Sequence, residues 1–292
     1  MANSTFSGPI RSENGMKLIS KNTTSGLISD RTLGTPIQDA RRVYFDEWFL
    51  QRPGLNANID QVSTVEVQRA LNRNWEALGT NVTTALVTFA STSAGVLATT
   101  AGADQDQAIL TPHLDTAATA WAGCKWGTEN EVHFETSIML PAIDNQKVWA
   151  GLKLTNDQLV ATDDDQIYFK FQTDATNSEA FTDFTKWHFV HSIGGTDYIS
   201  QLPITVAANT PYHLKITIDS DRKASIFVNG VQYNVTTTSG STGGTAVTTG
   251  TTPSTALTDD IDLIPYVGIE AGAAAAEAVN CHYVCCSRNV YE

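Results

Sequence analysis

The sequence predicts an all-β sandwich, and the stretch from Tyr212 to Tyr233 is the main reason. Its first strand alternates apolar and polar residues with a period of two, which is typical of a strand with one buried face. The apolar members of that strand are Leu214, Ile216 and Ile218. A polar turn at 220–223 separates it from a second alternating run, so three short strands are expected to follow one another here.

A hairpin turn fixes the register of the last two of these strands. Asn229 and Gly230 stand alone between two valines, as a two-residue type I′ turn requires, because both positions adopt positive φ. The turn pairs the two valines and places Ile226 opposite Tyr233 on the same face. The pattern is self-consistent, which favours antiparallel sheets over any helical alternative.

Similar short runs occur along the rest of the chain, and many such strands with almost no helix indicate a sandwich or barrel. The segment 61–78 is ambiguous, because it fits either one short helix or an irregular loop that carries Trp75 inward. The other expected strands are 43–49, 82–90, 95–99, 107–110, 132–140, 148–154, 167–171, 187–191, 197–202, 266–270 and 280–290.

Composition narrows the classes of function. The net charge of −13 argues against nucleic acid as a partner, since phosphate binding needs Lys and Arg. No window resembles a membrane span, and the N-terminus lacks the layout of a signal peptide. The spacing of the four cysteines does not suggest a disulfide framework, so reduced thiols and synthesis in a cytoplasm are expected. They are Cys124, Cys281, Cys285 and Cys286.

The charge divides the chain into two parts. Residues 1–42 carry a net charge of +3, which leaves −16 for residues 43–292. The first part is poor in large apolar residues and cannot build a core. It is therefore either a solvated tail or an extended arm that orders against a partner, followed by one sandwich domain. Within that domain, residues 236–258 are almost purely Thr, Gly and Ser, and are expected to form an exposed, mobile loop.

Two resemblances add to this interpretation. The Tyr212–Tyr233 hairpin and the late strand Val267–Glu270 resemble the concanavalin A-like jelly roll of laminin-G-type and legume-lectin-type modules over residues 130–290. The opening segment 2–15, the segment 44–50 and the ending 267–284 are similar to virion proteins of tailed phages. The first resemblance implies the fold, which hosts lectins, glycosidases and structural proteins alike.

The second resemblance implies a capsid decoration (cement) protein or a head fibre. Such a protein is made in the host cytoplasm, is located on the capsid surface, and binds the phage major capsid protein and copies of itself, here expected as a homotrimer. The arm is expected to supply the capsid contacts, and docking would be steered by its positive charge beside an acidic body. Its candidate contact residues are Phe6, Ile10, Arg11, Lys17, Lys21, Arg31, Arg41 and Arg42.

The residues give little support to catalysis, and neither an enzyme, a cofactor nor a metal is expected. Glu129, Glu131, His133 and Glu135 share one strand face, but this spacing favours a solvated outer face over a glycosidase pair. The carboxylates at 163–165 fit a solvated loop better than a Ca²⁺ site. The histidines at 188, 191 and 213 and the cysteines near the C-terminus also lack a chelating arrangement.

The alternative function is a carbohydrate-binding module or a lectin-like head fibre that attaches to host-surface glycans. Tryptophan rings can stack on sugars, and the candidates are Trp126, Trp149 and Trp187. Core aromatic residues of a sandwich explain the same tryptophans. The sequence alone leaves both readings open.

Overall fold

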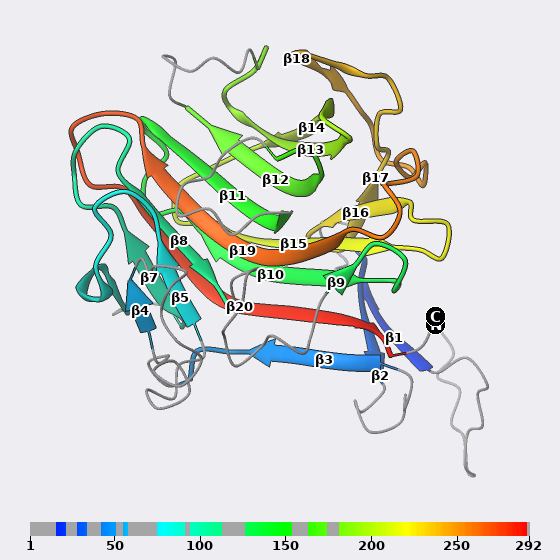
Figure 1. Cartoon of the computed structure of the whole chain (residues 1–292), viewed down its shortest axis with the longest axis horizontal. Coiled ribbons are helices and arrows are strands. Elements are labelled where there is room, and N and C mark those ends of the chain that lie inside the picture. Colours follow the sequence, from blue (N-terminus) through cyan, green and yellow to red (C-terminus); the bar gives the residue numbers. More distant parts are fainter. Residues whose placement is uncertain are drawn as a thin grey trace.

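The computed structural model describes residues 16–21, 28–33, 42–50, 55–57, 75–90, 94–112, 126–153, 163–173 and 181–290. Most of them belong to two large sheets that pack face to face as a jelly-roll sandwich (Figure 1). Across these ranges no α-helix is present, and the helical turn η1 (Thr84–Leu86) is a short 3-10 element. The all-β prediction is confirmed.

The smaller sheet has eight strands and contains the long C-terminal strand β20 near its middle. Its order is β17 (Val231–Tyr233), β16 (Ala224–Val228), β15 (Pro211–Ile218), β10 (His133–Met139), β20 (Ala278–Asn289), β7 (Val96–Thr99) and β6 (Val87–Phe89). The eighth strand, β3 (Arg42–Glu47), pairs with the C-terminal half of β20. Figure 1 shows β10, β20 and β3 side by side in one layer.

The larger sheet has ten strands and forms the second layer. Its order is β18 (Gly240–Ala246), β14 (Thr196–Thr205), β13 (Lys186–Ile193), β12 (Gln166–Gln172), β11 (Gln146–Lys153), β19 (Asp262–Ala271), β8 (Gln107–Thr111), β5 (Trp75–Leu78) and β4 (Leu55–Ala57), with β9 (Trp126–Gly127) paired to β19. Nearly all of its pairs are antiparallel, which suits short connections between neighbouring strands.

The hairpin predicted from Asn229 and Gly230 is present with the expected register. Both residues have positive φ, at 51° and 78°, as a type I′ turn requires. Ile226 lies opposite Tyr233, and the valines that flank the turn pair with each other. Local turn chemistry and strand alternation therefore specify this part of the fold together.

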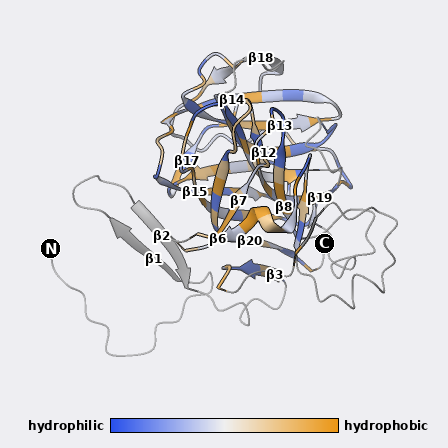
Figure 2. Cartoon of the chain, turned by 90° about the vertical axis from the view of Figure 1, so that its left-hand side faces the viewer, coloured by the Kyte–Doolittle hydropathy of each residue, from blue (hydrophilic) through white to orange (hydrophobic). Residues whose placement is uncertain are grey.

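The main core lies between the two sheets and follows the alternation of the strands. Along β10, Phe134, Thr136 and Ile138 are fully buried, whereas the residues between them are partly exposed. The larger sheet contributes aromatic side chains from neighbouring strands, such as Phe169 and Phe189, whose ring centroids are 5.5 Å apart. Figure 2 shows the resulting mixture of hydrophobic and hydrophilic positions along the strands.

Two segments differ from their predicted structure. Within 82–90 only Val87–Phe89 forms a strand, because η1 occupies the three residues before it. In the ambiguous segment 61–78, the described residues Trp75–Leu78 form strand β5 and not a helix, and Trp75 is buried as the loop alternative expected.

The Thr/Gly/Ser-rich segment 236–258 is largely exposed, as predicted, but it is not a free loop. It contains β18, which pairs in parallel with β14. Further along the segment, Ser254 and Leu257 are buried, and the Ser254 hydroxyl accepts a hydrogen bond from the Ala224 amide at 2.8 Å. Backbone hydrogen bonds replace the missing large side chains as anchors of this segment.

The predicted arm lies mostly outside the described residues. Two strands within it are described, β1 (Met16–Lys21) and β2 (Ile28–Leu33), and they form an antiparallel two-stranded sheet separate from the two large ones. In the part of the chain that the structure describes, no helix is long and apolar enough to cross a membrane. The strand β3 begins at Arg42, which is the last residue of the predicted arm.

The core predicts the effect of removing one aromatic ring. Phe169→Ala deletes a fully buried side chain between the sheets, and we expect a loss of about 3–5 kcal/mol in the free energy of unfolding. Phe89→Ala is the matched control, because Phe89 is 47% exposed, and we expect a loss below about 1 kcal/mol. Guanidinium-induced unfolding measures both, and equal losses would contradict this assignment of the core.

Candidate functional site

The two outer faces of the sandwich differ in their exposure and chemistry. The outer face of the larger sheet is covered, because both faces of β12 and most of β11, β13 and β19 are buried. The outer face of the smaller sheet is partly open, since alternate residues of β10 and β15 are half-buried or exposed. A site that binds a large ligand without any rearrangement of the protein is therefore expected on the outer face of the smaller sheet.

The covered face of the larger sheet carries a second apolar cluster. Its members are Leu78, Ile109, Trp149, Tyr168, Phe181, Val190, Ile199 and Tyr266. Buried charged groups surround it: Lys147 pairs with Glu270, and Lys153 lies 3.8 Å from Asp163. Paired charges and hydrogen bonds offset the cost of burying these groups, so this face forms a stable second packing layer.

The three tryptophans that are candidates for stacking on sugars under the alternative function do not form one site. Trp126 and Trp187 belong to the main core, and each is at most 1% exposed. Trp149 points to the other side of the larger sheet, where it is also buried. Core packing, the other interpretation of these residues, describes Trp126 and Trp187.

The open face of the smaller sheet instead displays Trp48, which immediately follows β3 and is 55% exposed. Its ring stacks on that of Tyr283, with centroids 4.6 Å apart and planes 29° apart. We call this pair, Trp48 and Tyr283, the aromatic platform. The preceding residue on the same face, Asp46, lies opposite Cys285 of β20.

A β-bulge in β20 brings Tyr283 to this face. Ser137 of β10 lies opposite Tyr283, whereas the next residue, Ile138, lies opposite Cys281, so His282 is an extra residue on β20. Cys281 and Val284 on either side both pack in the main core. The bulge therefore allows two consecutive residues, His282 and Tyr283, to reach side chains on the outer face.

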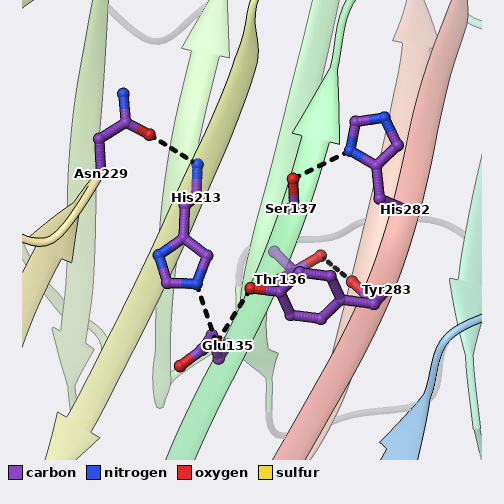
Figure 3. A network of polar contacts seen from close by, with 7 residues as sticks. All are labelled: Glu135, Thr136, Ser137, His213, Asn229, His282 and Tyr283. Atoms are coloured by element: carbon purple, nitrogen blue, oxygen red, sulfur yellow. Dashed lines mark hydrogen bonds and ion pairs between the residues drawn. The ribbon is translucent and has the colours of Figure 1, made fainter. Parts of the chain in front are cut away.

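Four polar side chains from β10, β15 and β20 lie around Tyr283, and we call them the polar network (Figure 3). They are Glu135, Ser137, His213 and His282. Oε1 of Glu135 accepts hydrogen bonds from the Tyr283 hydroxyl at 2.9 Å and from Nε2 of His213 at 2.8 Å. Nδ1 of His282 is hydrogen-bonded to the Ser137 hydroxyl at 2.9 Å. These bonds hold Tyr283 beneath Trp48.

The network keeps Glu135 ionised. Burial by itself raises the pKa of Glu135, but the hydrogen bonds from His213 and Tyr283 and the nearby charges outweigh burial and bring it below its ordinary value. Burial together with the Glu135 charge raises the pKa of Tyr283, so its hydroxyl remains a donor. The sequence assigned Glu135 to a solvated face, and the structure shows a half-buried, hydrogen-bonded acceptor.

The cysteines at the end of the chain are free thiols. Cys281 and Cys286 are buried, whereas Cys285 is partly exposed beside Asp46. Burial raises the pKa of Cys281 to about 12, and burial followed by the Asp46 hydrogen bond raises the pKa of Cys285. None of these pKa shifts favours a thiolate nucleophile.

The residues considered as metal ligands form hydrogen bonds or ring contacts with other residues of the chain. Asp165 accepts a hydrogen bond from the Gly194 amide at 3.2 Å and another from the Thr258 hydroxyl. His188 stacks on Phe181, and His191 stacks on Tyr198. Over the described ranges, no group of three His, Cys, Asp or Glu side chains is placed to hold a metal ion.

The residues predicted to bind a capsid fall into three places. Phe6, Ile10, Arg11 and Arg41 lie outside the described residues. Lys17 and Lys21 are on β1, and Arg31 is on β2. Arg42 begins β3, where its guanidinium donates to the Asn289 side chain and to the Glu131 carbonyl, each at 2.8 Å. Arg42 is thus engaged within the sandwich.

Comparison with known proteins does not establish a family or a function for this chain. No protein-family model matches the chain, and no curated protein matches it either. Similar solved structures include a protein of unknown function from Shewanella oneidensis MR-1, with 10% identity over 86% of this chain and 87% of that chain and a TM-score of 0.48. Bacillus licheniformis β-glucanase has 12% identity over 75% and 92%, with a TM-score of 0.43.

Peanut lectin crystallised with a nine-residue peptide is another similar structure, with 11% identity over 87% of this chain and 100% of the lectin and a TM-score of 0.44. These neighbours have the concanavalin A-like jelly-roll fold. Some are enzymes and others are lectins, so the likeness does not determine the function of this chain.

The buried histidines predict that stability depends on pH. Burial is the main cause that lowers the pKa of both His188 and His191 to about 4, against about 6.5 in the unfolded chain. Between these values the unfolded chain binds protons that the folded chain does not, so stability falls as the pH drops from 6.5 towards 4.

Between pH 6.5 and pH 4 we expect the free energy of unfolding to fall by on the order of a few kcal/mol. His191→Gln should make the profile shallower, because it removes one of the histidines whose pKa burial lowers, a group that also includes His133. Urea unfolding at a series of pH values provides the measurement, and an unchanged slope in His191→Gln would argue against buried neutral histidines.

Proposed function

We propose that the protein is a non-catalytic carbohydrate-binding module and that the aromatic platform with its polar network is the binding site. The observation that carries the proposal is the 55% exposure of Trp48 on a sheet face, stacked on a tyrosine that is itself hydrogen-bonded to a carboxylate. A flat, exposed indole offers an apolar surface for one face of a sugar ring.

The polar network supplies the second requirement of a sugar site. Sugar hydroxyls both donate and accept hydrogen bonds, and a few convergent polar groups beside an apolar surface fix the orientation of a ligand. Glu135 accepts hydrogen bonds, whereas Ser137 and His282 can do both. Because these side chains lie on three adjacent strands, the sheet holds them in place before the ligand binds.

The single carboxyl group of the polar network supports binding over hydrolysis. Cleavage of a glycosidic bond needs a carboxylic acid that is protonated near neutral pH, which requires a raised pKa. It also needs a second, ionised carboxylate. The pKa of Glu135 is lowered, which matches the ionised partner, but the polar network holds no second carboxyl group to act as the acid. A lectin-like role therefore suits this face better than a glycosidase role.

The biological setting rests on the sequence resemblance to tailed-phage virion proteins. We propose that the module works on a virion, as a head fibre or decoration protein whose arm contacts the major capsid protein, with the sandwich available to host-surface glycans. Mass spectrometry and electron microscopy of purified particles test this setting, and particles that lack the chain would exclude it.

The binding function is tested by removing the exposed indole. We expect the wild-type protein to bind sugars on a glycan array with micromolar affinity, and Trp48→Ala to weaken binding by about tenfold or more in calorimetry. Phe89→Ala is the matched control, because it removes an aromatic ring that is 47% exposed on another strand. Circular dichroism checks the fold of both variants.

Two results would refute the proposal. The wild-type protein could bind no sugar on the array, or Trp48→Ala could bind as tightly as Phe89→Ala does.

A further inference from the structure

A second exposed aromatic residue, Tyr44, lies on the same strand as the platform and is 39% exposed. Tyr44 lies opposite Ser287 and Asp46 lies opposite Cys285, so these two β3 residues share the outer face. Trp48 continues the same period of two and stacks on Tyr283. Tyr44 and Trp48 therefore mark two points along one line on the surface.

The spacing of these two rings is informative. Four residues of a strand span about 13 Å, which is wider than one pyranose ring. A single sugar can thus cover Trp48 or Tyr44 but not both. A ligand that contacts both rings has to be a chain of about three or four sugar units that runs along β3.

The position of β3 leaves room for such a chain. Among the described strands β3 pairs with β20 alone, so it is an edge strand there. Beyond Trp48 the surface continues with Leu50, which is 88% exposed. Among the described residues the exposed surface thus extends past the Trp48 end of β3, which suits an internal stretch of a polysaccharide better than a terminal sugar.

The charges near this line indicate a neutral ligand. Asp46 is exposed between the two rings, and Glu135 is ionised beside the platform. The neighbouring cations make contacts of their own. Lys215, opposite Glu135 on β15, lies with Nζ 5.6 Å from the ring centroid of Phe227. Arg42 donates to Asn289 and Glu131, and Arg288 donates to the Asn130 side chain at 2.6 Å. A uronate or sulfate group would meet carboxylates here, and like charges repel.

We propose that the platform binds an internal stretch of a linear, neutral polysaccharide that lies along β3 from Tyr44 to Trp48. This inference rests on the proposed carbohydrate-binding function and specifies the class of its ligand. Tyr44 supplies the second stacking surface and makes the site select for chain length. Asp46 and Glu135 select against acidic chains.

Calorimetry with oligosaccharides of increasing length tests the inference. The probes are gluco-, manno- and laminari-oligosaccharides of one to six units, with a galacturonate hexamer as the acidic counterpart. We expect the affinity for the neutral series that binds to rise by about tenfold between one and four units and then to level off. The galacturonate hexamer should bind at least about tenfold more weakly than the neutral hexamer.

Substitutions at Tyr44 and Trp48 distinguish the contributions of the two rings to binding. Tyr44→Ala should abolish the gain with length while keeping the affinity for short sugars, and Tyr44→Phe should restore the gain because the stacking ring is retained. Trp48→Ala should weaken binding at every length, and Phe89→Ala, on another strand, should leave the profile unchanged. Circular dichroism of each variant controls for folding.

The outcomes distinguish this inference from the function on which it rests. If the wild-type protein binds a neutral sugar but Tyr44→Ala keeps the full gain with length, the extended site is wrong and the platform alone is the site. Equal affinity for the galacturonate hexamer would overturn the charge selection. If the wild-type protein binds none of the probes, both the proposed function and this inference fail.

Discussion

The candidate site depends on one irregularity in the pairing of β20 with β10. If β20 alternated regularly from Cys281 onward, Tyr283 would face the core and Val284 would face solvent. The extra residue at His282 reverses this order, so Val284 packs inside while Tyr283 lies over Glu135. A β-bulge costs one place in the ladder of hydrogen bonds, and here it aligns a tyrosine beneath an exposed tryptophan.

The two outer faces have different roles because they are covered differently. On the larger sheet, aromatic rings and paired charges are buried, as in the contacts of Lys170 with the rings of Trp149 and Phe181. Phe181 also forms a β-bridge to Gly243 of β18, which ties the Thr/Gly/Ser-rich segment to this layer. The smaller sheet has no comparable apolar cluster on its outer face among the described residues, and its polar groups remain accessible.

The sequence predicts the fold well where local signals suffice. The Asn229-Gly230 turn and the alternation around it define a complete hairpin, and the structure reproduces its register. Composition was less informative for residues 236–258, because a segment without large side chains can still be anchored by backbone hydrogen bonds. For Trp75 the short strand β5 could not be distinguished from a helix, since four residues carry little periodicity.

The candidate site was much harder to predict than the fold. Residue type alone did not separate Trp126 and Trp187, which are core residues, from Trp48, which is exposed. Glu135 and His213 are 78 residues apart, so their pairing depends on the register of β10 with β15 and not on a local motif. No glycine or proline lies near His282 in the sequence, so no local signal predicts the β-bulge there.

A structure of the protein with a bound neutral tetrasaccharide would test the central claim most directly. We expect one sugar ring to lie flat over the indole of Trp48, with hydroxyl groups within hydrogen-bond distance of Glu135. Sugar bound instead beside Trp149 on the larger sheet, with Trp48 still free, would contradict this account.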